Sequence, residues 1–248
     1  MDLKRELRRL YSRLYGPYDY SSHVIALHDY CAIYMAVPKV ANSSLKTAVW
    51  HLMPEDIQAL PQTGRKQRTI YTVHREAMFK SRLRLYKHQV TKYPGYFVFA
   101  FVRNPWDRLL SCYKDKIGFG AIMEDGRYND PKTRSLHLGR GFQKDMSFET
   151  FVKAVVGTPD KKANRHFRSQ HTFLTDRAGN LLPSYLGRFE RLQRDFAEVM
   201  ERIGASHVTL PHVRRSQDAD YRSYYDASMR DAVASRYARD IELFGYEF

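Results

Sequence analysis

Residues 96–102, YFVFAFV, give the strongest strand signal in the chain. The run carries no charge and no alternation of polar and apolar positions, so it predicts a strand buried on both faces of a sheet. An earlier run, CAIYMAV at 31–37, has the same character. Helical patterns follow both runs, at 44–53 and 106–116, and Pro105 falls in a first turn, where proline is tolerated. Buried strands that alternate with helices predict an α/β layer fold with a mainly parallel sheet.

The same alternation continues along the rest of the chain. No internal repeat or linker divides it, so we expect a single domain over 1–248, with an N-terminal helical extension at 1–29 and a surface excursion at 117–147. The further elements expected are strands at 69–73 and 185–189, a hairpin over 173–182 that turns at 178–180, and helices at 3–15, 75–90, 148–156 (opened by Ser147), 192–203 and 226–244.

The chain is strongly basic. Its 248 residues hold 41 Lys and Arg against 27 Asp and Glu, a net charge of +14, and 43% hydrophobic residues are enough for a sizeable core. Residues 61–92 carry nine basic residues and one acid, or +8 of that charge. Such a field attracts nucleic acid, anionic lipid, acidic glycan or a phosphate-rich cofactor, and charge alone does not choose among them. A basic amphipathic helix from Leu3 to Tyr15 adds peripheral membrane contact as an alternative to docking on the domain.

Cysteine usage favours a reducing compartment. The chain has two cysteines, Cys31 and Cys112, too few for a disulfide framework or a four-ligand zinc site. Both lie in apolar or mixed segments, so we expect reduced core thiols and a cytoplasmic location. No apolar strand ends in an Asp that would suit magnesium, so no metal cofactor is expected.

Residues 33–46, IYMAVPKVANSSLK, form the first of two junctions suited to an anion. Small residues between a buried strand and a helix let backbone N–H groups converge on an anion at the helix N-terminus. Ser43 and Ser44 add hydroxyl donors and Lys39 adds a mobile charge; the alternative is a capping serine and a solvated lysine. The segment lacks the glycine-rich spacing of a nucleotide kinase loop, which disfavours a nucleoside-phosphate kinase.

The second junction is FVRNPWDRLLSCY at 101–113. Arg103 lies at the strand end and Ser111 about two turns into the following helix. A guanidinium in that place suits bidentate contact with phosphate. The alternative is an ion pair between Arg103 and Asp107.

Taken together, the two junctions resemble the PAPS-dependent carbohydrate sulfotransferases, the Golgi-type superfamily that includes chondroitin, dermatan and HNK-1 sulfotransferases (PAPS is 3′-phosphoadenosine 5′-phosphosulfate). Residues 37–46 look like the family's 5′-phosphosulfate loop, and 101–116 look like its 3′-phosphate motif. The segment NRHFRSQ at 164–170 looks like a divergent form of the family's His-Trp and Pro-Gln stretch. GRFERLQRDF at 187–196 and the tail from 221 to 248 also fit.

The resemblance implies a P-loop-like three-layer fold and transfer of a sulfuryl group from PAPS to a hydroxyl of a sugar or anionic glycan, releasing adenosine 3′,5′-bisphosphate. Lys39 is implied as the cation on the leaving oxygen. For the general base, His74 and His166 compete, with Glu76 as a carboxylate alternative. The residues implied to bind the cofactor are Lys39, Val40, Ala41, Asn42, Ser43, Ser44, Arg103, Ser111 and Arg188.

The sequence departs from the family in features that bear on cellular location. The sequence shows no membrane anchor or pattern of lumenal cysteines, so we expect a soluble, bacterial, cytoplasmic member. No nucleic-acid partner is expected, because no zinc or RNA-binding motif occurs, although a basic nucleic-acid- or membrane-binding protein stays the rival interpretation. The acceptor and the oligomeric state stay open. The basic stretch 61–92 lies between the two junctions and is expected to dock an anionic acceptor.

Overall fold

The computed structural model describes residues 24–59, 83–117, 138–139, 141–143, 145–211 and 220–248. The chain divides into two compact units: a first unit of residues 1–102 and 172–214, and a second unit of residues 103–171 and 215–248. Whether they constitute the single domain expected from the sequence stays a prediction. Within the described ranges, no helix is long and apolar enough to cross a bilayer.

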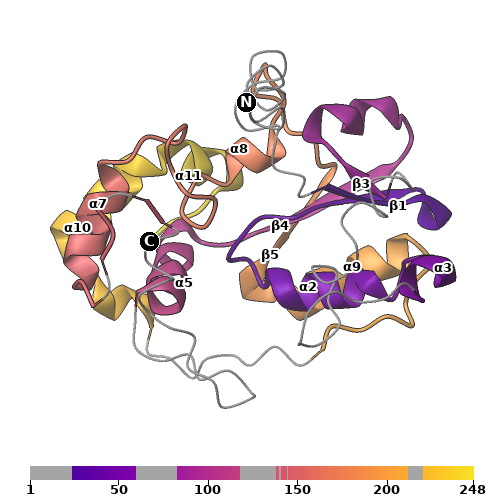
Figure 1. Ribbon diagram of the computed structural model, residues 1–248, viewed down its shortest axis with the longest axis horizontal. Coiled ribbons are helices and arrows are strands. Elements are labelled where there is room, and N and C mark those ends of the chain that lie inside the picture. Colours follow the sequence, from indigo (N-terminus) through magenta and orange to yellow (C-terminus); the bar gives the residue numbers. More distant parts are fainter. Residues whose placement is uncertain (1–23, 60–82, 118–137, 140, 144, 212–219) are drawn as a thin grey trace, which may run out of the picture. The chain divides into compact units, whose positions relative to one another are not determined.

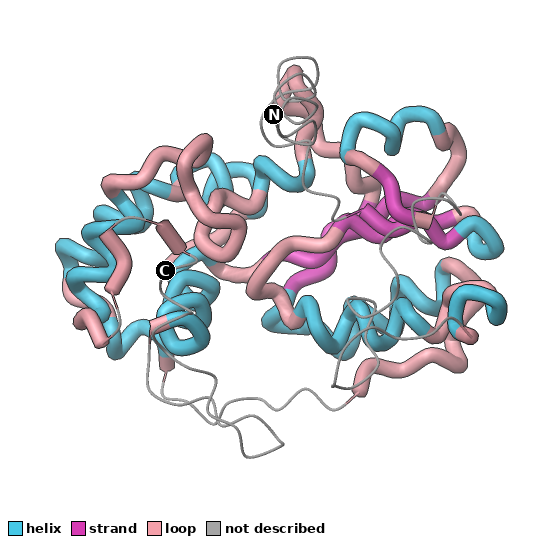
Figure 2. The backbone as a smooth tube through the Cα atoms, in the orientation of Figure 1, coloured by secondary structure: helices cyan, strands magenta, loops and turns pink. Residues whose placement is uncertain are grey.

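The first unit is built on a sheet that has five strands in the described part of the chain (Figure 1). Four strands run in one direction and β1 opposes them, because β1 pairs antiparallel with β2 and β3 while β2, β4 and β5 pair parallel. Figure 2 shows α2 and α9 on the same side of this sheet. The α/β prediction with a mainly parallel sheet flanked by helices is therefore confirmed. In spatial order the strands are β3 (Arg84–Leu85), β1 (Val24–Leu27), β2 (Ala32–Met35), β4 (Phe97–Val102) and β5 (Tyr185–Arg188).

Burial explains why the apolar runs became central strands. Every residue of β2 is buried, as is every residue of β4 after Phe97. Continuous apolar sequence suits a strand covered on both faces. Helix α9 adds an apolar stripe to the core through Leu192, Phe196 and Val199, which recur at helical spacing. In the described residues of the first unit, the helices are η1 (His28–Tyr30), α2 (Asn42–Trp50), α3 (Glu55–Gln58), η2 (Lys87–Lys92), η3 (Phe189–Arg191) and α9 (Leu192–Arg202); the short α8 spans His171–Leu174.

The second unit is helical in the described residues. Its core gathers apolar side chains of α5, α7 and α10 with residues from the connecting segments, such as Phe142 and Phe167. The side chain of Asn104 caps α5 by accepting the N–H of Trp106. Ser147 caps α7 by accepting the N–H of Thr150, and its place at the start of this helix was predicted. Its elements are α5 (Pro105–Lys116), α7 (Phe148–Val156), η4 (Tyr221–Tyr224), α10 (Ala227–Arg236) and α11 (Ala238–Phe244).

Several predictions of local structure were wrong. The expected helical extension 1–29 includes a strand, β1, which pairs with β2 over four residues. The expected helix 75–90 contains β3 and η2 in its described part, because Leu83 and Leu85 are buried at alternate positions beside β1. The final helix is interrupted at Tyr237, and the exposed Cys31 is no core thiol.

Other predictions were confirmed in part. The turn at 178–180 exists, with Thr175 bridged to Leu181, but Phe173 and Leu174 belong to α8 and form no strand. Within the expected surface excursion 117–147, Leu138 and Phe142 are buried. The helix at 3–15, the strand at 69–73 and most of the excursion lie outside the described residues.

Candidate functional site

The carboxyl ends of β2, β4 and β5 lie at one edge of the first unit's sheet, because these strands are parallel. The register pairs Met35 with Ala100 and Val102 with Arg188. The loop 36–41 leaves the sheet at this edge, and Arg103 follows directly on the last residue of β4. In open α/β sheets, ligands bind outside the carboxyl ends of the strands. These three strand ends therefore form the candidate binding edge of the first unit.

The loop after β2 has an unusual backbone. Lys39 and Ala41 adopt left-handed conformations, with φ of 69° and 44°, on either side of the buried Val40. Such conformations cost free energy in residues with a Cβ and concentrate at ligand-binding loops. They also occur in the turns whose successive N–H groups form anion-binding concavities. The loop backbone is therefore suited to an anion.

The N-terminus of α2 continues this surface. Ala41 is the N-cap, so neither Ser43 nor Ser44 caps the helix. The first helical hydrogen bond runs from Leu45 N–H to Ala41 O at 3.0 Å, which leaves the N–H groups of residues 42–44 outside the helical ladder. Those groups and the positive end of the helix dipole attract negative charge.

Asn42 offers a further binding group at the start of α2. Its Oδ1 atom is buried and has no hydrogen-bond partner within the described structure. Buried polar atoms are rarely left without a partner. Because the amide can be placed in either orientation, this unmet capacity suits a donor or an acceptor of a bound ligand.

The second junction holds Arg103 in an ion pair. Its Nε and Nη2 atoms donate to the two carboxylate oxygens of Asp107, each at 2.7 Å. The ion pair with Asp107, which the sequence analysis gave as the alternative to phosphate binding by Arg103, is thus present. Ser111 is half-buried. It lies one turn beyond Asp107 on the same side of α5, because helical residues four apart lie one above the other. Arg103 is therefore paired with the face of α5 that also carries Ser111.

Arg188 ends β5. Its N–H donates to Oδ2 of the buried Asp195 at 2.8 Å, which ties the strand end to α9. Arg191 also approaches the Asp195 carboxylate, at 3.5 Å. The backbone of Arg188 is consequently fixed at the edge where loop 36–41 begins.

The two histidines predicted as bases have different outcomes. His74 lies outside the described residues, as does Glu76. His166 is half-buried in the second unit, where its Nδ1 and its backbone N–H both lie within hydrogen-bond distance of Asn164 Oδ1, at 2.7 and 3.0 Å.

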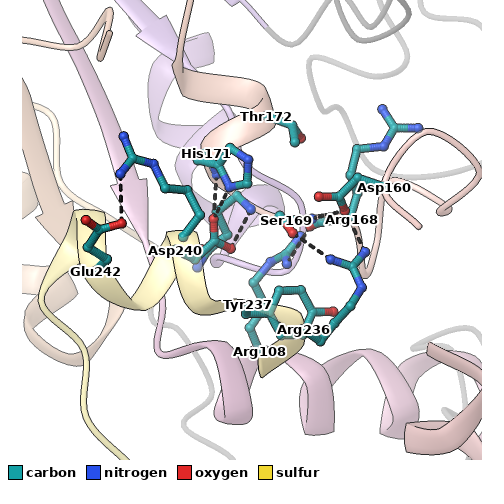
Figure 3. Close-up of polar contacts among 12 residues, drawn as sticks. Arg108, Asp160, Arg168, Ser169, His171, Thr172, Arg236, Tyr237, Asp240 and Glu242 are labelled. Carbon is teal, nitrogen blue, oxygen red and sulfur yellow. Dashed lines mark hydrogen bonds and ion pairs between the residues drawn. The ribbon is translucent and has the colours of Figure 1, made fainter. Parts of the chain in front are cut away.

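His171 is a functional candidate that the sequence analysis missed. Its Nδ1 lies 2.7 Å from Oδ1 of Asp240, a carboxylate with 0% exposure that also accepts the N–H of His171 and of Gln170 (Figure 3). A carboxylate at Nδ1 fixes the tautomer in which Nε2 carries the lone pair, which is the arrangement of a histidine base. The adjacency of Gln170 and His171 was visible in the sequence, but nothing local connects either residue to Asp240, 69 positions away from His171.

Buried charges surround the same segment. Burial raises the pKa of Asp160, but hydrogen bonds from Arg236 and from the Ser169 N–H outweigh it and hold the pKa below its usual value. Burial lowers the pKa of Arg108, whose Nη1 donates to Arg168 O at 2.9 Å. These contacts hold the backbone of residues 160–171 against α5 and α10 (Figure 3). Within the described ranges, no three His, Cys, Asp or Glu side chains are grouped as metal ligands would be.

Comparisons with known proteins show that this chain is similar to sulfotransferases. A family model described as "Sulfotransferase family" matches residues 22–247. Human carbohydrate sulfotransferase 14 is 28% identical over 244 residues, covering 90% of this chain and 60% of the relative. The zebrafish (Danio rerio) protein of that name is 27% identical over 240 residues, covering 90% and 62%, and carbohydrate sulfotransferase 10 of Xenopus laevis is 25% identical over 171 residues, covering 62% and 48%. The chain thus spans about 60% of the length of the first of these relatives. No solved structure matches the chain significantly.

Proposed function

This chain belongs to the sulfotransferase family, and on that premise we propose that it transfers a sulfuryl group from PAPS to a hydroxyl group of a carbohydrate. The observation that carries the proposal is the loop after β2, where two left-handed residues, Lys39 and Ala41, lead into the N-terminus of α2. The names of the relatives, carbohydrate sulfotransferases 14 and 10, support a carbohydrate acceptor.

PAPS supplies the sulfuryl group in this proposal, and the bond from sulfur to the bridging oxygen of its 5′-phosphate breaks as a bond to the acceptor oxygen forms. Lys39 stabilises the negative charge that grows on the bridging oxygen. The N–H groups of residues 42–44, the hydroxyls of Ser43 and Ser44 and the backbone of Val40 and Ala41 hold the 5′ end.

Arg103 and Ser111 bind the 3′-phosphate of the same ligand in this proposal. Asp107 keeps the guanidinium of Arg103 oriented, so the arginine presents a fixed donor surface to the phosphate. Arg188, at the end of β5, contributes a further positive charge near the nucleotide.

The base takes the proton of the acceptor hydroxyl. His74, His166 and the carboxylate of Glu76 keep the roles that the sequence suggests, and the contact with Asp240 adds His171 as a further candidate. A loss of kcat in only one of the variants His74→Ala, His166→Ala and His171→Ala, with unchanged binding of adenosine 3′,5′-bisphosphate, identifies the base.

The test of the function is transfer from ³⁵S-labelled PAPS to a panel of polysaccharides, oligosaccharides and small alcohols. Lys39→Ala is expected to lower kcat by at least about a hundredfold, the usual effect of removing one group that stabilises developing charge. Arg177→Ala, which removes an exposed positive charge of the same unit outside the basic stretch 61–92, is the control and keeps full turnover. Absence of labelled product with every acceptor, or full turnover by Lys39→Ala, contradicts the proposal.

A further inference from the structure

The side-chain amide of Gln170 pairs with the main chain of Arg103. Its Nε2 donates to Arg103 O at 2.8 Å, and its Oε1 accepts the N–H of Arg103 at 3.1 Å. Gln170 is completely buried. The amide therefore pairs with both the N–H and the C=O of Arg103, which directly follows β4. The backbone of a neighbouring strand would make the same two hydrogen bonds.

Gln170 is itself held from behind. Its N–H donates to Oδ2 of Asp240 at 2.6 Å, and the other oxygen of that carboxylate accepts from His171. The preceding N–H, of Ser169, donates to Oδ1 of Asp160 at 3.0 Å, and Asp160 is held in turn by Arg236 (Figure 3). Two buried or largely buried carboxylates thus fix the backbone from which the Gln170 amide reaches Arg103.

Arg103 is consequently fixed at both ends. Gln170 holds its main chain, and Asp107 holds its guanidinium through two bonds of 2.7 Å. A long side chain held in one geometry loses less conformational entropy when it binds an anion than a mobile side chain does. The affinity that Arg103 gives to a phosphate therefore depends on the groups that hold it.

We infer that Gln170 is a positioning residue for the contact between Arg103 and the 3′-phosphate of the nucleotide, an inference that rests on the proposed function. Without the amide, the N–H and C=O of Arg103 lose their partner, and the main chain moves to satisfy them elsewhere. The guanidinium then no longer presents the geometry that favours the 3′-phosphate. Gln170 thereby determines the preference for a nucleotide that carries this phosphate over one that lacks it.

The test compares two ligands by calorimetry: adenosine 3′,5′-bisphosphate and adenosine 5′-phosphate. Gln170→Met keeps the length of the side chain and removes its hydrogen bonds. It is expected to weaken the bisphosphate about tenfold, the usual scale for loss of buried hydrogen bonds, while the affinity for the 5′-phosphate changes by less than about twofold. Tyr237→Phe is the matched control, because it removes a hydrogen bond to Phe167 O in the same segment without touching Arg103, and it leaves both affinities unchanged.

A merely structural role for Gln170 weakens both ligands equally, and that outcome overturns the inference. In a double-mutant cycle, Arg103→Ala removes the preference for the bisphosphate, and adding Gln170→Met to it has little further effect. Should Gln170→Met fail to fold by circular dichroism, Gln170→Glu serves instead, since it keeps the acceptor for Arg103 N–H and loses the donor to Arg103 O. A preference unchanged in Arg103→Ala contradicts the 3′-phosphate assignment of the proposed function. A preference lost in Arg103→Ala and kept in Gln170→Met contradicts the present inference alone.

Discussion

At the scale of single residues, the ion pair of Asp160 and Arg236 shows how charge holds the segment that carries Gln170. Arg236 Nη2 lies 2.6 Å from Asp160 Oδ1, and the two side chains are only 9% and 19% exposed. Burial alone would raise the pKa of Asp160, but the Arg236 and Ser169 donors lower it below its usual value. The folded state therefore favours the ionised carboxylate.

Asp160→Asn is expected to destabilise the protein by about 3 kcal/mol at neutral pH, because it leaves the guanidinium of Arg236 largely buried without its counter-charge. The folded pKa of Asp160 lies below the unfolded one, so its stabilisation is full above the unfolded pKa of about 4 and disappears as the pH falls through the folded value. Urea unfolding at several pH values should show the gap between wild type and variant closing below about pH 4. Asp231→Asn, in an exposed pair with Arg230, is the control with little effect. A gap that stays constant down to about pH 2 would contradict this account.

The same residue scale marks what local sequence could suggest and what it could not. Lys39 and Arg103 could be proposed as site residues because strand, loop and helix follow one another locally in the chain, and their roles stay predictions. The pairing of His171 with Asp240 could not be identified, because it joins residues 69 positions apart and depends on how α11 packs. The link from Gln170 to Arg103, 67 positions apart, was hidden for the same reason.

At the scale of elements, a helix or strand could be predicted where the sequence has a long apolar pattern or a local N-cap residue. Helix α7 was predicted with its bounds because Ser147 gives a local N-cap and the apolar positions repeat at helical spacing. Strand β3 was missed because its two residues are too few for a period to show, and β1 because its apolar run has only four residues, fewer than the run 31–37 that predicted β2. Their place beside β2 depends on antiparallel pairing, which the sequence around them does not express.

Gly187 tests the packing of β5 on β4. It lies opposite Phe101 in the parallel register, and a Cβ built on it would overlap the Phe101 ring. Because Phe101 is fully buried and cannot move aside freely, Gly187→Ala is expected to cost about 1–3 kcal/mol, the usual penalty of overpacking. Thermal and urea denaturation measure this cost. Gly157→Ala, where the nearest atom is 3.4 Å from the new Cβ, is the control with a change within about 0.5 kcal/mol. Equal stability of both variants would show that the Phe101 ring yields.

At the scale of the whole molecule, the net charge of +14 is the property that the fold does not explain. The proposed nucleotide site uses only a few of these charges, chiefly those of Lys39 and Arg103. The basic stretch 61–92 carries +8 of the total, and of its residues only 83–92 are described. Unevenly placed charge of this size raises the rate and strength of association with polyanions. We therefore expect an anionic carbohydrate to be a better acceptor than a neutral one.

Salt tests this expectation, because exposed charges are screened as ionic strength rises. With PAPS saturating, the KM for an anionic glycan should rise at least roughly threefold between about 50 and 200 mM NaCl, whereas kcat and the KM for a neutral oligosaccharide change little. Arg82→Gln combined with Arg84→Gln should weaken the salt dependence and raise the KM at low salt without altering the affinity for adenosine 3′,5′-bisphosphate. Arg239→Gln, which removes an exposed charge in α11, is the matched control. If the KM of the anionic glycan is independent of salt, or if Arg239→Gln acts as strongly as the double variant, then the basic stretch does not dock the acceptor. In the second of these outcomes the charge acts only as a diffuse field around the molecule, since its effect no longer depends on where in the sequence it is removed.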